Sequence, residues 1–165
     1  MPTNDTRRYS ASETPNTMSS PPPSKQHAPR PGNGQLVLVV DDDADIRLSI
    51  ANLLLDEGYL VEEAPNGRPA LRLLRASRKP LVVLLDLNMP GMDGKTLLQA
   101  IGDDPFDDLA DRHAFILLTA RDQRTLPLDF ATLLTRLGVV FVAKPFNISD
   151  LLTAVAAATA RLSPL

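Results

Sequence analysis

Residues 36–43 read LVLVVDDD, a run of five aliphatic residues followed directly by three aspartates. A short, continuous and β-branched aliphatic run is typical of a strand that is covered on both faces, as in a parallel sheet. Ile46, Ile50 and Leu54 then recur at helical spacing. Gly58 suits the end of that helix, because glycine readily adopts the left-handed conformation that often follows a last helical turn. The stretch therefore predicts a buried strand that leads into a helix.

The same alternation of strand and helix continues along the rest of the chain. Further strands are predicted at 59–64, 81–85, 115–118 and 139–143, and further helices after Asn66, at 96–101, at 127–137 and after Asn147. Strict alternation with continuous aliphatic strands predicts an α/β fold with a parallel sheet and helices on both faces. Five units are too few for an eight-fold barrel, so an open, doubly wound sheet remains. Such sheets bind ligands beyond the carboxyl ends of their strands, where the strand order reverses.

Short polar side chains are placed to cap three of these helices. Either Asp43 or Asp45 can cap the first helix, and Asn66 can cap the second. Asn147, with Asp150 three residues later, can cap the last helix. Each of these side chains can accept hydrogen bonds from the free N–H groups of a first helical turn.

The composition excludes several classes of protein. The 165 residues include 17 basic and 20 acidic side chains, a net charge of −3, which argues against a general nucleic-acid surface. Cysteine is absent, so disulfides, thiolate metal sites and a cysteine nucleophile are excluded. The apolar runs are far shorter than the roughly 20 residues that cross a bilayer, and the N-terminus lacks the apolar core of a signal peptide. We expect a cytoplasmic protein with no membrane insertion and no direct nucleic-acid binding.

Residues 1–34 differ in composition from the rest of the chain. They hold seven of the 15 prolines and five serines, with almost no aliphatic side chains. Four basic and two acidic residues give this segment a charge of +2, which leaves −5 for the remainder. Such a segment buries too little apolar surface to offset the entropy of ordering it. We expect a disordered tail over 1–34 and one folded domain over 35–163.

Chemically active side chains follow four of the five predicted strands. Asp41-Asp42-Asp43 follows the first strand, Asp86 the third, Thr119 the fourth and Lys144 the fifth. Several carboxylates at one sheet edge repel one another unless a cation lies among them, and oxygen ligands at a partly open site favour Mg²⁺. A carboxylate nucleophile, a divalent cation, an ammonium group and a hydroxyl together stabilise a phosphoryl group in transfer. The strand ends therefore predict phosphoryl chemistry.

Four motifs in this chain resemble those of the receiver domain of bacterial two-component response regulators, the group that includes the chemotaxis response regulator. They are VVDDD at 39–43, LLDLNMPGMDG at 84–94, LLTA at 117–120 and FVAKPF at 141–146. The motifs occur in the family's order, and the resemblance covers about residues 36–162. It implies a flavodoxin-like, doubly wound (βα)5 fold, a three-layer sandwich whose parallel sheet has the strand order 2-1-3-4-5.

The resemblance implies a role for each acidic residue of the site. Asp86 is the phosphoacceptor, whose carboxylate attacks phosphorus to form an acyl phosphate. Asp42 is the principal carboxylate ligand of Mg²⁺, and Asp41 holds the metal through a water molecule or through contact with another ligand. Asp86 also ligates Mg²⁺, and Asn88 contributes its backbone carbonyl.

The resemblance also implies a switch and a set of partners. The Thr119 hydroxyl donates to the phosphoryl group, Lys144 bridges Asp86 and that group, and Phe141 is the aromatic ring that moves inward when Thr119 moves. The Lys144–Pro145 bond is expected to be cis. The phosphoryl group is expected from a sensor histidine kinase or a histidine phosphotransfer protein, and the output is binding to a downstream protein. Because the chain ends shortly after the last helix, we expect a stand-alone receiver.

Two alternatives use the same residues differently. A haloacid-dehalogenase-like phosphatase also combines Asp, Thr or Ser, Lys and Mg²⁺, and Asp41 to Asp43 supplies its Asp-x-Asp spacing. That motif normally continues into Thr or Val, however, whereas Ala44-Asp45 follows here. In such a phosphatase Asp86 would also have no role. A degenerate receiver that acts only as a binding module is the other alternative, and the complete set of site residues argues against it.

Three stretches depart from the family pattern, and two histidines are left without a role. The stretch 102–108 is long and acidic and is expected to be a solvated loop. The spacing between Thr119 and Lys144 is longer than in the family, with residues 121–124 placed before Pro127. The fifth strand is preceded by Gly138-Val139-Val140, where the family usually has small or acidic residues. These departures fall near the predicted output surface rather than the site. We interpret His27 and His113 as surface histidines.

Overall fold

The computed structural model describes residues 32, 34–105, 108–120 and 122–162. In this part of the chain, five strands pair in parallel in the order β2-β1-β3-β4-β5. The strands are β1 (Leu36–Val40), β2 (Leu60–Ala64), β3 (Leu81–Asp86), β4 (Ala114–Thr119) and β5 (Val140–Ala143). The predicted strand order is therefore confirmed.

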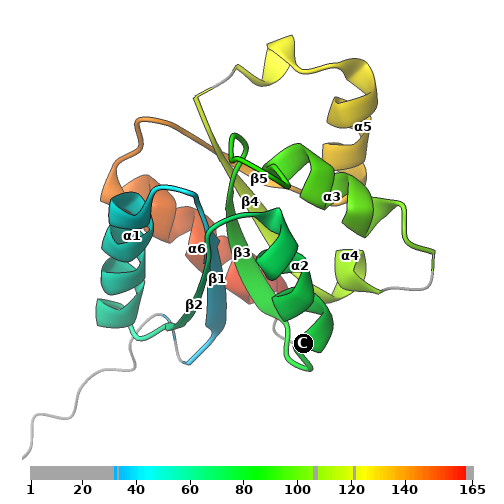
Figure 1. Cartoon of the computed structure of the whole chain (residues 1–165). Helices are drawn as coiled ribbons and strands as arrows, with labels where there is room; N and C mark the ends of the chain where they lie inside the picture. The colour runs from blue at the N-terminus through cyan, green and yellow to red at the C-terminus, as the bar shows by residue number, and fades with distance from the viewer. Residues whose placement is uncertain (1–31, 33, 106–107, 121, 163–165) are drawn as a thin grey trace, which may run out of the picture.

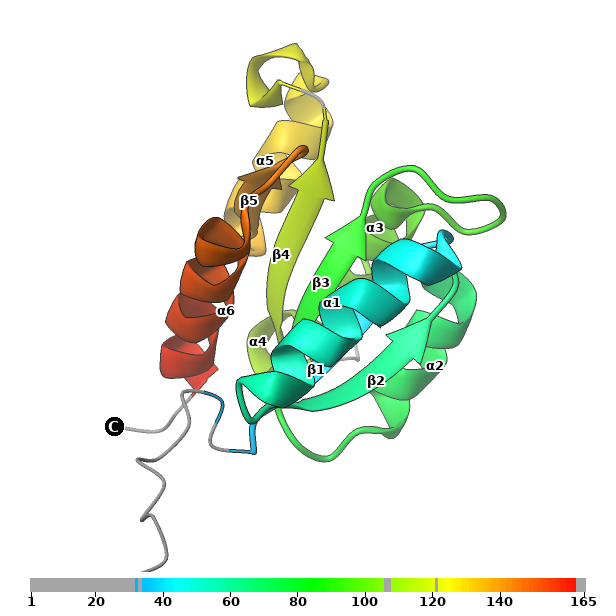
Figure 2. The same cartoon turned by 90° about the vertical axis from the view of Figure 1, so that its left-hand side faces the viewer.

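Helices cover both faces of this sheet. They are α1 (Ala44–Asp56), α2 (Gly67–Ala76), α3 (Gly94–Gly102), α4 (Leu109–Arg112), α5 (Leu128–Arg136) and α6 (Ile148–Leu162), with a 3₁₀ turn at Gln123–Thr125. Figures 1 and 2 show α1 and α6 on one face and α2, α3 and α5 on the other, which confirms the three-layer, flavodoxin-like sandwich. The short helix α4 was not predicted; it follows the acidic stretch 102–108, of which 106–107 lie outside the described residues. Among the described helices, none is long and apolar enough to cross a membrane.

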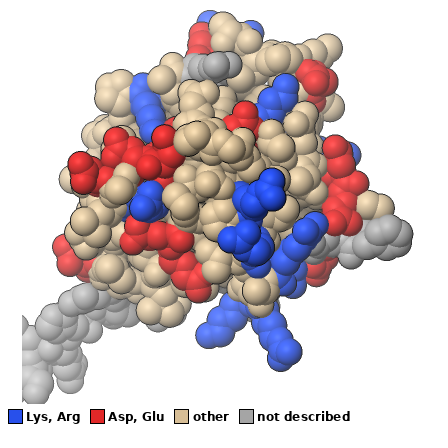
Figure 3. Space-filling view, in the orientation of Figure 1, with Lys and Arg blue, Asp and Glu red and all other residues tan. Residues whose placement is uncertain are grey.

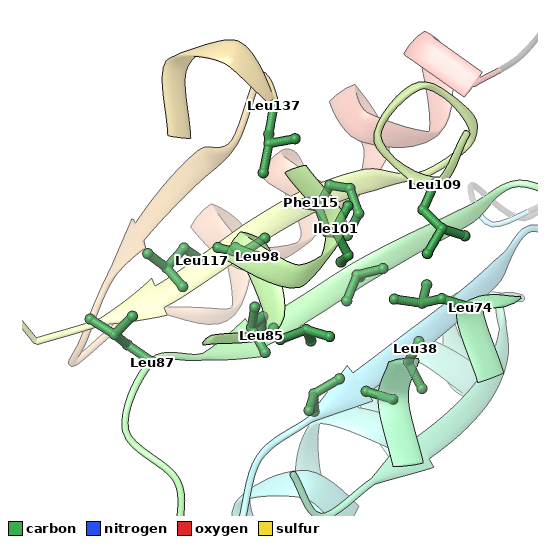
Figure 4. Packing of buried hydrophobic residues seen from close by; sticks show 14 of the residues in the cluster. Leu38, Leu74, Leu85, Leu87, Leu98, Ile101, Leu109, Phe115, Leu117 and Leu137 are labelled. Atoms are coloured by element: carbon green, nitrogen blue, oxygen red, sulfur yellow. The ribbon is translucent and has the colours of Figure 1, made fainter. Parts of the chain in front are cut away.

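Alternate side chains of the central strands pack into two apolar clusters, one on each face of the sheet. Leu38, Leu85 and Phe115 belong to the cluster that contacts α2, α3 and α5 (Figure 4). Val37 and Leu84 point to the opposite face, where α1 and α6 cover them. Burial of each large aliphatic side chain contributes roughly 1.5–3 kcal/mol, so this packing fixes the strands and the residues that follow them.

The predicted helix caps are present. Asp43, rather than Asp45, caps α1 by accepting from the backbone N–H groups two and three residues later, at 2.9 and 3.1 Å. Asn66 caps α2 by accepting from the N–H group two residues later at 3.0 Å. Asn147 accepts from the N–H of Asp150 at 2.8 Å before α6. These local bonds set where each helix begins beside the carboxyl edge of the sheet.

Two glycines that precede the predicted domain start at residue 35 contact the turn after α1. The N–H groups of Gly32 and Gly34 donate to the carbonyl oxygens of Glu57 and Gly58 at 3.0 and 3.1 Å. A Cβ atom at Gly32 would lie 2.4 Å from the backbone nitrogen of Tyr59, so only glycine fits this approach. Residues 1–31 and 33 of the predicted tail lie outside the described residues.

His113 is buried, so its interpretation as a surface histidine is wrong. Its Nδ1 accepts from the N–H of Leu81 at 3.0 Å, and its Nε2 lies 3.3 Å from the carbonyl oxygen of Leu74. The ring therefore links the start of β3 to α2. These partners are 32 and 39 residues away in the chain, so no local sequence pattern could predict them. His27 lies outside the described residues.

Candidate functional site

The carboxyl ends of three strands bring Asp41, Asp86 and Lys144 together at one edge of the sheet. Asp41 directly follows β1, Asp86 is the last residue of β3, and Lys144 directly follows β5. β1 is flanked by β2 on one side and by β3 on the other, so the strand order reverses here. This is the place at which open α/β sheets bind ligands.

The Lys144 ammonium group joins two buried carboxylates. Its Nζ lies 2.9 Å from Oδ1 of Asp86 and 3.2 Å from Oδ2 of Asp41. Burial by itself would lower the pKa of Lys144, but the hydrogen bonds and charges of Asp86 and Asp41 outweigh it and raise that pKa above its ordinary value. Lys144 is therefore a cation at neutral pH, fixed between two anions.

Backbone N–H groups hold the other oxygen of each buried carboxylate. The N–H of Asp43 donates to Oδ1 of Asp41 at 2.9 Å, and the N–H of Asn88 donates to Oδ2 of Asp86 at 3.0 Å. Hydrogen bonds to a charged acceptor are stronger than those between neutral groups. Both carboxylates are therefore held in a fixed orientation by the protein itself.

Three carboxylates lie close enough together to hold one metal ion. Asp41, Asp42 and Asp86 each offer an oxygen atom, and these atoms all lie within 4.8 Å of one another. Asp42 is exposed while the other two are buried, so the cluster opens to solvent on the side of Asp42. Three carboxylates against one ammonium leave an excess of negative charge, and a hard divalent cation with oxygen ligands suits such a site. These residues therefore fit Mg²⁺, and the Asn88 carbonyl as a further ligand remains a prediction.

Thr119 and Phe141 lie on the neighbouring strands. Thr119 ends β4 and is buried, and its carbonyl oxygen accepts from the N–H of Lys144 at 2.8 Å. The residue before it, Leu118, pairs with Asp86 across β3 and β4, so Thr119 lies one position further toward the site. Phe141 of β5 is half-buried against the apolar cluster on the α3 and α5 face. The fold thus brings the predicted switch residues to the same side of the sheet.

The turn between β3 and α3 is shaped by two glycines. Gly91 has a φ of 81°, a conformation that costs little only for glycine. At Gly94, a Cβ atom would lie 2.5 Å from the carbonyl oxygen of Asp86, so α3 approaches β3 closely here. Across the site, the Lys144–Pro145 bond is cis, as the resemblance implied.

Arg47 belongs to the site and was missed by the sequence analysis. Its Nη1 donates to the carbonyl oxygen of Asp41 at 2.7 Å, and its Nε donates to Glu63 at 3.0 Å. This side chain ties α1 and β2 to the backbone of the buried carboxylate. Its position one helical turn after the cap Asp43 is the only local signal, and the pairing with Glu63 depends on the fold.

A family model identifies the chain. The model of the response regulator receiver domain matches residues 37–156, which is most of the chain and includes every residue of the site. The chain belongs to this family. The resemblance read from the four motifs is thereby confirmed, and the chain contains a response regulator receiver domain.

Named relatives and solved structures agree with this assignment. The receiver domain is 37% identical over 134 residues to response regulator MprA of Mycolicibacterium vanbaalenii, covering 78% of this chain and 52% of MprA. It is 34% identical over 129 residues to transcriptional regulatory protein PdtaR of Mycobacterium tuberculosis, covering 76% of this chain and 57% of PdtaR. The chain thus spans about half the length of these curated relatives.

Two solved receiver structures are similar over nearly their whole length. A CheY-like receiver domain protein from Methanospirillum hungatei has 30% identity and a TM-score of 0.65, and the match covers 77% of this chain and 96% of that one. Chemotaxis protein CheY4 of Vibrio cholerae has 28% identity and a TM-score of 0.62, with 76% and 98% covered. The receiver fold therefore accounts for the described domain.

Proposed function

We propose that this receiver domain accepts a phosphoryl group on Asp86 in a Mg²⁺-dependent reaction and thereby changes its affinity for a protein partner. One observation carries the proposal: Lys144 lies between Asp86 and Asp41, with the exposed Asp42 beside them. A buried nucleophile, a fixed cation and an open cluster of carboxylates are the groups that phosphoryl transfer requires.

Asp86 is the proposed nucleophile. One of its oxygens attacks the phosphorus of a phosphohistidine, and the P–N bond breaks with its electron pair passing to the imidazole nitrogen. Lys144 and the Thr119 hydroxyl donate hydrogen bonds to the phosphoryl oxygens as negative charge gathers there. Asp41, Asp42, Asp86 and the Asn88 carbonyl would hold Mg²⁺, which would supply positive charge beside the phosphoryl group.

A protein is the proposed donor, either a sensor histidine kinase or a histidine phosphotransfer protein. A mainly apolar groove of about 440 Å³ lies beside Lys144, between α1 and the start of α6. It is lined by Asp45, Ile46, Ser49, Ile50, Lys144, Pro145 and Phe146. An apolar groove next to reactive groups suits a docked helix better than a small polar donor. The chain then acts as a signalling switch rather than as an enzyme with its own substrate.

Thr119 and Phe141 are the proposed moving parts of this switch. Phosphorylation adds a dianionic group with strong acceptor oxygens, so the Thr119 hydroxyl moves toward it. Phe141 then fills the space that is vacated, which changes the surface around α5, β5 and α6. A downstream protein that binds one of these two states more tightly shifts the equilibrium between them.

The proposal covers a domain over about 35–163 that acts in the cytoplasm. We propose a protein–protein contact as the output of this domain, without direct nucleic-acid binding. The name of PdtaR places that relative in transcription, but only part of its length is matched here.

Phosphorylation by acetyl phosphate tests the proposal directly. With Mg²⁺ present, intact-mass measurement should show one added phosphoryl group in the wild type and none in Asp86→Asn, because an amide is no nucleophile for this reaction. Asp129→Asn is the matched control, since Asp129 is an exposed carboxylate in the first turn of α5. Asp42→Ala should retain the fold but require a much higher Mg²⁺ concentration for labelling.

Two results would overturn the proposal. Full labelling of Asp86→Asn would place the acceptor elsewhere in the chain. Sustained turnover of unrelated phosphomonoesters, without a stable label, would instead indicate a phosphatase of the haloacid dehalogenase type.

A further inference from the structure

The side chain of Arg47 is largely buried and bonds in two directions at once. It is 17% exposed, and its Nε donates to Oε2 of Glu63 at 3.0 Å. Its Nη1 donates to the carbonyl oxygen of Asp41 at 2.7 Å. A guanidinium group is a rigid, planar fork of donors, so the bond to Glu63 fixes the direction in which the other donor points. The carbonyl group of Asp41 is therefore held by an oriented, charged donor.

The carbonyl group that Arg47 holds belongs to the peptide unit between Asp41 and Asp42. Because a peptide unit is planar, a hydrogen bond to its oxygen also fixes the orientation of the N–H group and the Cα atom of Asp42 at its other end. The preceding peptide unit is held by β2, since the N–H of Asp41 donates to the carbonyl oxygen of Ala64 at 3.2 Å. Arg47 thus fixes the backbone at the point where the chain leaves β1 and enters the carboxylate cluster.

Asp42 depends on this backbone more than the other two carboxylates do. Asp41 and Asp86 each accept from Lys144 and from a backbone N–H group. Asp42 is exposed, and within the described residues its carboxylate makes no hydrogen bond or ion pair. Its oxygen atom nevertheless lies within 4.8 Å of those of Asp41 and Asp86. The position of this third carboxylate is therefore set by the peptide unit that carries it.

Glu63 compensates the charge of Arg47. A cation beside the carboxylate cluster would by itself oppose the binding of a second cation, because like charges repel. The salt bridge to Glu63 reduces this effect, since the pair has no net charge. Figure 3 shows acidic side chains gathered over the start of α1 and over β2, with a small basic area among them. An arginine in this setting can support a metal ligand without repelling the metal strongly.

We propose that Arg47 is a positioning residue for Mg²⁺. Through the Asp41 carbonyl, it holds Asp42 where its carboxylate joins those of Asp41 and Asp86. This inference rests on the proposed function, because it concerns the metal of the proposed phosphorylation site. It also gives Glu63 a role, since this carboxylate both orients the guanidinium group and neutralises it. The residues that prepare the metal site then extend to β2, the edge strand at one end of the sheet order, which supplies no ligand.

Two other roles of Arg47 predict different results. If the guanidinium group acted only by its charge, its removal would tighten Mg²⁺ binding, because a like charge would be gone. If it only stabilised the packing of α1 beside β2, its removal would lower the stability but leave the Mg²⁺ affinity of the folded chain unchanged. A positioning role predicts weaker Mg²⁺ binding by the folded chain. The sign of the change in affinity therefore distinguishes the three roles.

Titration calorimetry with MgCl₂ on the unphosphorylated full chain measures this sign. Arg47→Gln should raise the Kd for Mg²⁺ roughly tenfold, as is common when a group that orients a metal ligand is removed. Arg47→Lys keeps the charge but lacks the planar fork, so it should restore only part of the affinity. Arg72→Gln is the matched control and should bind like the wild type, because Arg72 is an exposed arginine of α2.

Glu63→Gln provides a second, milder test of the same arrangement. It leaves the arginine in place but removes the charge that orients and compensates it, so the Kd for Mg²⁺ should rise by a smaller factor than in Arg47→Gln. Chemical denaturation of each variant shows whether it is folded under the conditions of the titration. If Arg47→Gln does not fold, Glu63→Gln and Arg47→Lys still decide the question, because either one at wild-type affinity contradicts the positioning role.

A double-mutant cycle tests whether Arg47 acts through Asp42. In Asp42→Ala the ligand that Arg47 positions is absent, so adding Arg47→Gln should change the remaining Mg²⁺ affinity by less than about twofold. A merely structural effect on α1 would not depend on the carboxylate of Asp42. An equal loss of affinity with and without that carboxylate would therefore contradict the proposed route.

The outcomes for Mg²⁺ binding and for phosphorylation can be told apart. Unchanged or tighter Mg²⁺ binding by folded Arg47→Gln would overturn the positioning role, as would a wild-type chain that binds no Mg²⁺. Labelling of Asp86 by acetyl phosphate is measured separately, so the proposed phosphorylation can stand when the positioning role fails. Conversely, weaker Mg²⁺ binding by Arg47→Gln in a chain that is never labelled on Asp86 would support the positioning role and contradict the acceptor role of Asp86.

Discussion

At the scale of single residues, Lys144 compensates the charge of two buried carboxylates. Lys144→Met leaves Asp41 and Asp86 without their cation, so the metal-free protein should lose about 1–2 kcal/mol of stability, less than for a fully buried pair because Lys144 is partly exposed. Mg²⁺ should bind several-fold more tightly to this variant, since a like charge beside the metal is gone. Chemical denaturation with and without Mg²⁺, and Mg²⁺ titration calorimetry, measure the two effects. Unchanged stability and metal affinity would show that the ion pair is not maintained in solution.

The raised pKa of Lys144 also predicts a dependence on pH. A cation whose folded pKa lies above its ordinary value of 10.5 stabilises the fold below that value, and the contribution is lost as pH rises through the folded pKa. Burial raises the pKa of Tyr59 as well, which weakens the fold in the same alkaline range. The free energy of unfolding should therefore fall above pH ~10.5 in the wild type, and the fall should be smaller in Lys144→Met, which keeps the contribution of Tyr59 but loses that of Lys144. Equal slopes in the two proteins would contradict the role of Lys144.

At the scale of elements, the approach of α3 to the end of β3 positions Asp86. Gly94→Ala would place a methyl group against the carbonyl oxygen of Asp86 and should cost about 1–3 kcal/mol while slowing phosphorylation. Gly91→Ala is the matched control: its left-handed φ should cost roughly 1–2 kcal/mol, but the added methyl group meets open space. Phosphorylation rates at equal folded fractions distinguish the two. If both variants were phosphorylated at the wild-type rate, the close approach would not control the geometry of Asp86.

The turn between α1 and β2 predicts where a truncation becomes harmful. A chain that begins at residue 32 should unfold at the wild-type temperature, because the described contacts of Gly32 and Gly34 are kept. A chain that begins at residue 36 loses these two backbone hydrogen bonds and a third, from the N–H of Leu60 to the carbonyl oxygen of Gln35, and should be less stable by about 1–3 kcal/mol. Calorimetry of the two truncated chains beside the full chain measures this. If the chain that begins at residue 32 were less stable than the full chain, residues 1–31 would also contact the domain.

At the scale of the whole molecule, coupling between the site and the partner surface requires more than the acceptor residue. Thr119→Ala should still accept a phosphoryl group on Asp86, more slowly, but should lose most of the difference in partner affinity between its two states. Thr119→Ser keeps the hydroxyl and should retain that difference. Partner binding by phosphorylated and unphosphorylated forms of each variant measures the coupling. Full discrimination by Thr119→Ala would exclude the proposed route through Phe141.

Sequence patterns were sufficient wherever the physical cause lies within one element. Continuous aliphatic runs identified the strands, because both faces of a central strand are buried. Apolar residues at helical spacing identified the main helices, because one face of each helix is buried. Asn66 and Asn147 were recognised as caps because a cap bonds to residues two or three positions away. The side chains after the strands were found because parallel strands place their carboxyl ends at one edge. The fold and the group of Asp41, Asp86 and Lys144 could therefore be predicted from the sequence.

Only the tertiary structure decided the features that depend on partners far apart in the chain. His113 is buried because Leu81 and Leu74 offer it backbone partners. Its neighbours in the sequence are polar, and they suggested a surface position instead. Arg47 supports Asp41 because β2 brings Glu63 beside α1, and Gly32 is ordered because the turn after α1 accepts its hydrogen bond. In each case the energy comes from contacts between elements, and their geometry exists only in the folded chain.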